Sequence, residues 1–241
     1  MITPRSSLLR THRQQQPATA QSDAFIRFLQ RHSVKRFAKN SIVLHQGEIP
    51  TSVYVVKKGI VRSYSISDSG DEKPINFCSE SEIIATTWVF QKAPAAVYFY
   101  EAYVDCEVYS VPRDQLRAFI SSNNEVMAQL LDRYVTKYIG KTLRINALEY
   151  SRAIDKISHT LQYLCLSYGR ESEAGVVEIE LPLAQQELAN LTGLTRETTG
   201  LELKKLQQRG VITYQKRRFI VHTDELRKVI GEDELSDLKL R

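Results

Sequence analysis

The residues with the clearest chemical potential lie between positions 196 and 218, where basic side chains outnumber acidic ones. This segment has seven Lys or Arg residues against two Glu, whereas residues 151–241 as a whole balance fourteen basic with fourteen acidic residues. Cations gathered in one short segment are suited to contact the phosphates of a nucleic acid. The alternative is a solvated charged helix followed by an ordinary hairpin turn. The basic residues are Arg196, Lys204, Lys205, Arg209, Lys216, Arg217 and Arg218.

Glycines and apolar residues around these cations predict two helices and a hairpin. A short amphipathic helix that includes 188–191 is expected to stop at Gly193, which can adopt the positive φ that a tight turn requires. Thr195 can cap a second helix over 196–208. Two short strands should follow on either side of a turn at 215–218. This layout is typical of a winged helix-turn-helix, whose second helix lies in the DNA major groove.

The second helix of this motif is expected to have two distinct faces. Leu203 and Leu206 should face the protein core, because apolar residues three apart share one side of a helix. The residues predicted to point outward are Arg196, Thr199, Lys204 and Lys205.

Composition sets the broad class of the protein. The chain has 241 residues, 42% hydrophobic and 25% charged, with a net charge of +5, which suits one large domain or two small ones. Its three cysteines show no metal-ligand spacing, and they indicate reduced thiols rather than a disulfide framework. No apolar run approaches the ~18 residues of a membrane helix, and no signal peptide is evident. We therefore expect a cytoplasmic protein without membrane contact.

The N-terminal half changes from a polar tail to a β-rich region. Residues 1–22 are expected to be mobile, and Ser22 should cap a short helix. From 41 to 111 the apolar period is two, with turn signals every eight to twelve residues, which predicts a β-sandwich or jelly roll with room for a ligand pocket. The predicted strands are 42–45, 53–56, 61–66, 74–77, 83–84, 97–104 and 107–111.

A long helix should connect the two halves. After a short helix over 115–120, Ser122 is expected to begin the longest helix, with Glu125 at the capping-box position. A stripe of apolar residues runs along this helix with three- and four-residue spacing, interrupted only by Lys141, and it predicts a two-stranded homodimer. Packing of the stripe on the chain's own sandwich is the alternative. The stripe comprises Met127, Leu131, Tyr134, Tyr138, Ile145 and Leu148.

Together these parts resemble the Crp/Fnr (cyclic AMP receptor and fumarate-nitrate reductase regulator) family of bacterial transcription factors. The match is most specific in Glu187-Leu188-Ala189, in Gly193-Leu194-Thr195-Arg196-Glu197-Thr198 and in Gly210-Val211-Ile212. The resemblance implies an α+β fold with a cyclic-nucleotide-binding-like β-roll, a long dimerisation helix and a C-terminal winged helix-turn-helix. We assign these parts to 23–121, 122–150 and 151–241.

The resemblance also implies how individual residues would meet DNA. Arg196 and Glu197 would touch base edges, since arginine pairs with guanine and glutamate accepts from cytosine. Thr195 and Thr199 suit phosphate or thymine-methyl contacts, and the phosphate-binding cations would be Lys204, Lys216, Arg217 and Arg218. Gln185, Gln186 and Gly200 complete the candidate set.

This chain departs from the family pattern at two positions of the motif. Leu201 stands where relatives that bind the best-known half-site carry a second arginine, so the target sequence should differ. Ala184 replaces a threonine cap, which removes one phosphate contact and about 1 kcal/mol of helix stability.

The effector cassette of the family is degenerate in this sequence. Ala85-Thr86 stands where a Gly-Glu pair would bind ribose, and no arginine occurs between Arg62 and Arg113 to bind a cyclic phosphate. Lys92 is the remaining basic candidate, on an expected exposed turn. The sequence therefore predicts that cyclic AMP is not the effector. Candidate residues for an effector pocket are Ala85, Thr86, Trp88 and Phe99.

Other functional classes find less support in the residues. Three scattered cysteines do not provide the thiolates of an iron–sulfur cluster, and no catalytic triad, metal spacing or phosphate loop is present. We expect a non-enzyme without a cofactor that binds double-stranded DNA as a homodimer, with RNA polymerase and an unidentified small molecule as possible partners. The alternatives are a sensing or scaffold protein whose winged helix contacts proteins, or a regulator that still responds to a cyclic nucleotide.

Overall fold

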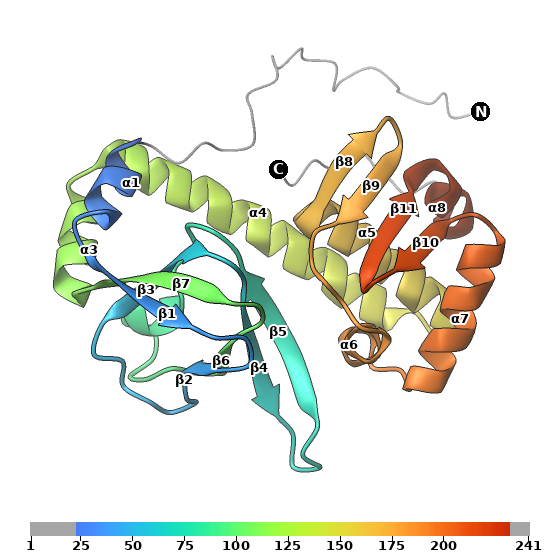
Figure 1. The fold of residues 1–241 in the computed structure, drawn as a ribbon, viewed down its shortest axis with the longest axis horizontal. Coiled ribbons are helices and arrows are strands. Elements are labelled where there is room, and N and C mark those ends of the chain that lie inside the picture. The colour runs from blue at the N-terminus through green and yellow to red at the C-terminus, as the bar shows by residue number, and fades with distance from the viewer. Residues whose placement is uncertain (1–22, 232–241) are drawn as a thin grey trace, which may run out of the picture.

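Two lobes joined by a long helix make up residues 23–231, the part of the chain that the computed structural model describes (Figure 1). The predictions for the tail 1–22 and for Ser22 as a cap lie outside this part. The helices are α1 (Asp23–Leu29), α2 (Thr86–Val89), α3 (Arg113–Ser121), α4 (Asn124–Glu149), α5 (Ala153–Tyr168), α6 (Gln185–Thr192), α7 (Arg196–Gln208) and α8 (Thr223–Ile230). The strands are β1 (Ser33–Phe37), β2 (Ile42–Leu44), β3 (Val53–Lys58), β4 (Val61–Ile66), β5 (Glu72–Cys78), β6 (Phe99–Ala102), β7 (Cys106–Val111), β8 (Gly169–Glu173), β9 (Val176–Ile179), β10 (Ile212–Gln215) and β11 (Arg218–His222).

The N-terminal lobe is a β-roll of two antiparallel sheets, with strand orders β1-β7-β3 and β2-β6-β4-β5. Val56, Val61, Ala102 and Val108 are fully buried in the core of the roll. A second core joins residues of β3 and β7 to α1, α3 and the start of α4. The fold class predicted from the period-two pattern is confirmed.

The β-roll differs from the prediction at strand β1, at residues 83–84 and at α2, a short helix that was not predicted. Strand β1 was missed, because four of its five residues are exposed and its sequence shows no alternation of apolar and polar residues. The predicted strand 83–84 is only an isolated bridge between Val55 and Ile83.

The N-cap of the long helix α4 lies one residue later than predicted. The side chain of Asn123, not that of Ser122, caps it by accepting the Val126 amide N–H at 3.1 Å. Ser122 instead ends the preceding helix α3. Asn and Ser are equally good caps, so composition could not separate the two positions.

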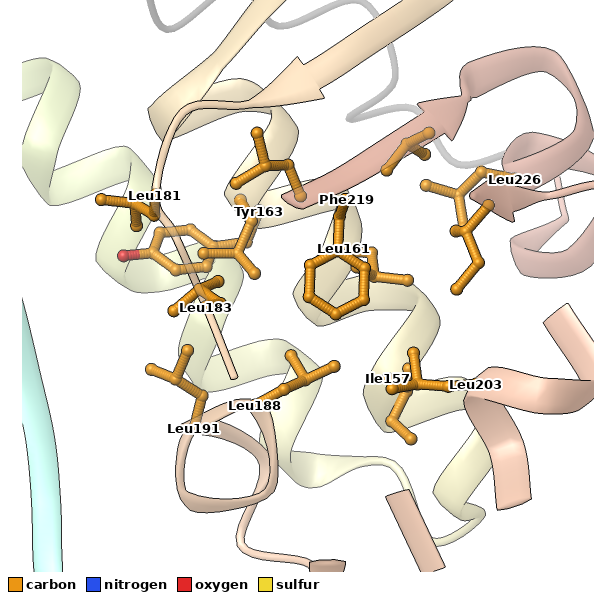
Figure 2. Packing of buried hydrophobic residues seen from close by; sticks show 14 of the residues in the cluster. Ile157, Leu161, Tyr163, Leu181, Leu183, Leu188, Leu191, Leu203, Phe219 and Leu226 are labelled. Carbon is orange, nitrogen blue, oxygen red and sulfur yellow. The ribbon is translucent and has the colours of Figure 1, made fainter. Parts of the chain in front are cut away.

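The C-terminal lobe packs α5, α6, α7 and α8 with the sheet β10-β11-β9-β8 around one apolar core (Figure 2). Leu161, Leu188, Leu203 and Phe219 are at most 1% exposed in this core. Helix α7 has the predicted bounds, whereas β8 and α8 were missed. The hairpin β8–β9 begins at Gly169, where a Cβ atom would lie 2.3 Å from the Cys165 carbonyl oxygen, so only glycine fits there.

The two lobes contact each other directly beside α6 and β5 (Figure 1). Phe77 and Tyr103 of the β-roll belong to the same buried cluster as the core of the C-terminal lobe. The Tyr103 hydroxyl donates a hydrogen bond to the Pro182 carbonyl at 2.8 Å. The C-terminal lobe is therefore packed against the β-roll in this arrangement.

Candidate nucleic-acid interface and ligand pocket

The start of α7 is held rigidly by the turn before it. Gly193 has φ of +67°, which lets α6 end and the chain change direction. The Thr195 hydroxyl then accepts the Thr198 amide N–H at 3.1 Å as an N-cap. Arg196 and Glu197, in the first turn of α7, are exposed to solvent. Both side chains therefore project from a capped helix with a buried inner face, rather than from a loop.

Further along α7, the exposed face carries Leu201 and Lys204. Leu201 is 63% exposed and lies one turn after Glu197, so the two side chains share the solvent-facing side. Lys204 is exposed, and Lys205 forms an ion pair with Glu202 at 2.7 Å. The solvent-facing side of α7 thus combines charged side chains with one apolar residue.

The prediction that Thr199 points outward is wrong. Its side chain is fully buried, on the same face as Leu203, which follows one turn later. Its hydroxyl has no hydrogen-bond partner within residues 23–231. Thr199 belongs to the core of the C-terminal lobe and not to its outer surface.

The remaining residues predicted on the two motif helices lie near the crossing of α6 and α7. Gln185 is partly buried, and its side-chain oxygen would lie 3.6 Å from a Cβ atom at Gly200. Gln186 is exposed and donates from its amide to Asn190 at 2.9 Å. Gly200 therefore allows α6 and α7 to pack closely, and Gln186 faces solvent beside this contact.

Basic residues of the hairpin β10–β11, the wing, are partly held by carboxylates of the same lobe. Lys216 and Arg217 both have positive φ, +49° and +65°, and form its tight turn. Arg217 pairs with Glu187 at 2.9 Å and donates to the Pro182 carbonyl at 3.2 Å, and Arg218 pairs with Glu178. Within residues 23–231, Lys216 forms no ion pair.

Glu187 connects the wing, the start of α6 and the β-roll. Its carboxylate accepts hydrogen bonds from the Ala184 amide N–H and from the Arg217 guanidinium, which gives one half of a capping box; the half that a hydroxyl at position 184 would supply is missing. Burial, together with the neighbouring Glu187, raises the pKa of Tyr103 well above its usual value. This junction brings together side chains from β6–β7, α6 and the wing.

A cavity of about 270 Å³ lies between the β-roll and α4. Of the four predicted effector-pocket residues, Ala85 and Thr86 line it, whereas Trp88 and Phe99 do not. Trp88 is buried beneath Arg113, with 4.5 Å from the guanidinium carbon to the ring centroid, and Phe99 stacks on Tyr64 with ring centroids 5.4 Å apart. Those two aromatic side chains therefore support the β-roll and do not face the cavity.

The side of the cavity that α4 provides was not predicted from the sequence. Residues of α4 that line it are Leu130, Arg133, Tyr134, Lys137, Tyr138 and Lys141. Lys92, the basic residue that the sequence offered as a substitute, is exposed and does not line the cavity. The four-residue spacing of Arg133, Lys137 and Lys141 was the available signal, because it places them on one face.

Lys137 and Lys141, the two lysines that line this cavity, have pKa values shifted in opposite directions. Lys137 forms an ion pair of 2.5 Å with Glu82; burial by itself would lower the lysine pKa, but Glu82 together with Cys78 and Tyr134 raises it. Burial, followed by repulsion from Lys137, lowers the pKa of Lys141. Burial raises the pKa of the neighbouring Cys78 thiol to about 11, so it stays protonated at neutral pH. The cavity is therefore electropositive, with Lys137 paired.

The apolar stripe of α4 is exposed in the single chain, as the dimer prediction requires. Tyr138 is 72% exposed and Leu131 64%, while Val126 and Leu143 on other faces of the helix are buried. The other predicted members, Met127, Tyr134, Ile145 and Leu148, are also exposed. Packing on the chain's own sandwich therefore leaves most of this stripe exposed, although Tyr134 contacts Phe90 edge-on with ring centroids 6.5 Å apart.

Comparison with known proteins identifies the class of this architecture. The family model of the cyclic nucleotide-binding domain matches residues 34–123, and that of the Crp-like helix-turn-helix domain matches residues 155–229. A β-roll followed by a long helix and this DNA-binding domain defines a transcriptional regulator. The chain belongs to the Crp/Fnr family, whose members are regulators and not enzymes.

Individual relatives are distant but span most of the chain. The cAMP-activated global transcriptional regulator CRP of Salmonella typhimurium is 21% identical over 195 residues, 81% of this chain and 92% of that protein. The HTH-type transcriptional regulator ArcR of Staphylococcus haemolyticus is 27% identical over 73% of this chain and 76% of that protein. The structure of FixK2 from Bradyrhizobium japonicum matches with a TM-score of 0.67 at 20% identity, over 84% of this chain and 98% of that one.

Two kinds of feature, membrane-spanning helices and metal-binding clusters, are absent from residues 23–231. None of the helices there has the length and apolar character to cross a membrane. The same residues contain no group of three or more His, Cys, Asp and Glu side chains that could hold a metal ion.

Proposed function

We propose that this protein is a homodimeric, sequence-specific DNA-binding transcriptional regulator. The observation that carries the proposal is the exposed, N-capped start of α7, where Arg196 and Glu197 face solvent on a rigid support. A helix presented in this way fits the major groove and can contact base edges with its first turn.

Within that groove, the side chains divide into two roles. Arg196 can donate two hydrogen bonds to guanine, and Glu197 can accept from the cytosine amino group. Leu201 offers a methyl-rich surface to thymine in place of a charged contact. Lys204 and the wing cations would contact phosphate, which adds affinity and salt dependence without selecting a sequence. Thr199 is excluded from these roles by its burial.

Dimerisation would occur along α4. The exposed stripe of Leu131, Tyr138 and their apolar neighbours is larger than the isolated apolar residues common on monomer surfaces. Pairing two such helices buries the stripe and places two α7 helices on half-sites about 34 Å apart. The resulting target is a pseudo-palindrome.

We propose that cyclic AMP is not the effector of this protein. No arginine of the β-roll lines the cavity, and the basic residues there come from α4. RNA polymerase is the expected protein partner at a promoter, as for a regulator that acts on transcription.

Selection of DNA sites in vitro by the purified, ligand-free protein at about 100 mM salt tests the proposal. We expect a palindrome with half-sites one helical turn apart that cyclic AMP does not alter. The dimer is tested by Leu131→Asp, with Ile66→Asp as a control, because Ile66 is also exposed but lies in β4. Sedimentation should show a monomer only for Leu131→Asp. A monomeric wild-type protein, or selection of no motif, contradicts the proposal.

A further inference from the structure

Helix α7, at the outer edge of the C-terminal lobe (Figure 1), carries a leucine at the centre of its outward face. The buried residues Thr199, Leu203 and Leu206 define the inner face of this helix. At about 3.6 residues per turn, the direction opposite to them falls between Glu197 and Leu201. Leu201 is 63% exposed, and in the described part of the C-terminal lobe it is the only large apolar side chain left exposed. The apolar group is therefore placed where α7 can meet a base edge.

Glu197, one helical turn before Leu201, has a carboxylate without a partner. It forms no ion pair or hydrogen bond within residues 23–231, whereas the carboxylates of Glu187 and Glu202 in the same lobe pair with cations. A free carboxylate close to DNA phosphates is repelled by them unless it accepts a hydrogen bond from a base. Side chains four residues apart on a helix are neighbours, so α7 presents an acceptor and an apolar group side by side.

The major groove offers few donors to a carboxylate. They are the N4 amino group of cytosine and the N6 amino group of adenine. On adenine the amino group lies beside N7, an acceptor that repels a carboxylate. On cytosine it lies beside C5, which carries either hydrogen or a methyl group. An acceptor with an apolar neighbour therefore matches cytosine, and the match is best when C5 carries a methyl group.

The other two bases fit this pair of side chains less well. Thymine has the methyl group, but it presents the acceptor O4 to the carboxylate of Glu197. Guanine presents the acceptors O6 and N7, which would lose water beside Leu201 without gaining a hydrogen bond.

We propose that Glu197 and Leu201 together contact one cytosine of each half-site and favour the form that is methylated at C5. Glu197 accepts a hydrogen bond from the N4 amino group, and Leu201 covers the methyl group and removes it from water. Methylation of the target then strengthens binding. This inference rests on the proposed function, because it requires α7 to lie in the major groove with Glu197 at a base edge.

Fluorescence anisotropy of the full-length protein on the duplex obtained by site selection tests the inference. Each cytosine of a half-site is replaced in turn by 5-methylcytosine, and each thymine by uracil, which lacks the methyl group. At one cytosine, methylation should tighten binding about fourfold for each half-site, the effect of burying one methyl group. No replacement of thymine by uracil should have an effect that depends on Leu201.

Variants of α7 assign the effect to its residues. Leu201→Ala should bind the methylated and unmethylated duplexes equally, and its fold should be preserved because the side chain is exposed. Glu197→Ala should lose the preference for cytosine at the same position, because it removes the acceptor. Lys204→Ala is the control on the same face of the helix: it should weaken binding to both duplexes alike and keep the fourfold ratio of about four to one.

The inference is overturned if methylation of no cytosine tightens binding or if the effect persists in Leu201→Ala. It is also overturned if Leu201 acts only on a thymine, because the leucine would then lie over a neighbouring base pair. Selection of no motif overturns the proposed function and this inference with it. A selected motif that the protein binds without regard to methylation overturns this inference alone.

Discussion

The DNA-facing surface and the cavity beside α4 use the same kinds of side chain in opposite ways. The first draws its residues from the continuous stretch 195–218. Its cations lie in water, where charges are screened and have no desolvation cost. The second collects residues from β4, β5, β6, α2 and α4, and turns its cations inward. A lysine on α7 is available to any phosphate, whereas Lys137 in the cavity is already paired with Glu82.

The difference shows that position in the fold, rather than residue type, sets what a cation does. At the wing, Arg217 and Arg218 already have carboxylate partners, so they must exchange Glu187 and Glu178 for phosphate when DNA binds. In the cavity, Lys141 has no partner to exchange within residues 23–231. Each of the following predictions tests one side of this contrast, beginning with the largest effect.

Replacing Arg196 should produce the largest loss, because it removes a bidentate base contact. Arg196→Ala is expected to weaken specific binding by about 1–3 kcal/mol and to relax base preference at one position of each half-site. Lys204→Ala is the matched control: it should weaken binding to all sequences alike and reduce the salt slope by about 1. Fluorescence anisotropy on matched and mismatched duplexes measures both. Equal losses of specificity in the two variants would contradict the assigned roles.

Replacing Thr199 should change stability and leave DNA binding intact. Thr199→Val removes a buried hydroxyl that has no partner within residues 23–231 and preserves its shape, so we expect a gain of about 1 kcal/mol in the free energy of unfolding. Chemical denaturation and anisotropy measure the two properties. A fall in DNA affinity would instead indicate that Thr199 contacts DNA, as the sequence predicted.

Releasing Arg217 from its carboxylate should strengthen DNA binding modestly. Glu187→Gln keeps an acceptor for the Ala184 N–H but abolishes the ion pair, an exchange worth up to about 1 kcal/mol. We expect the salt slope to steepen by up to about 0.9, the value of one added phosphate contact. Glu180→Gln is the control, since it removes the same charge from the same lobe at a residue paired with Arg170. Identical salt slopes in the two variants would show that Arg217 does not reach phosphate.

The smallest effect concerns the titration of Glu178. Its hydrogen bond to Arg218 holds the pKa of the carboxyl below its usual range. A lowered carboxyl pKa means that the pair stabilises the fold above the ordinary carboxyl pKa and that this contribution is lost as pH falls through the folded-state value. NMR titration should give a pKa below about 4.3 for Glu178, and Arg218→Ala should return it toward that value. An unshifted pKa in the wild-type protein would mean that Arg218 is free for DNA.

The interface was far more predictable than the cavity, and the reason is the range of the interactions. The bounds of α7 and its Thr195 cap depend on hydrogen bonds within a few residues, so they follow from local sequence. Trp88 and Phe99 were assigned to the cavity as aromatic side chains that could line an apolar pocket. Packing against Arg113 and Tyr64, distant in sequence, takes both rings away from it.

By itself the sequence determined the order of the parts, the capped helix with Arg196 and Glu197, and an apolar stripe on α4 that the single chain leaves exposed. These features depend on the helical and strand periods, which are properties of the local chain. Only the tertiary structure decided which side of a helix another element covers. It buried Thr199, paired Arg217 with Glu187, and turned Lys141 from an apparent break in the stripe into part of an electropositive cavity. Burial and charge compensation are set by groups far apart in sequence, so the local pattern does not specify them.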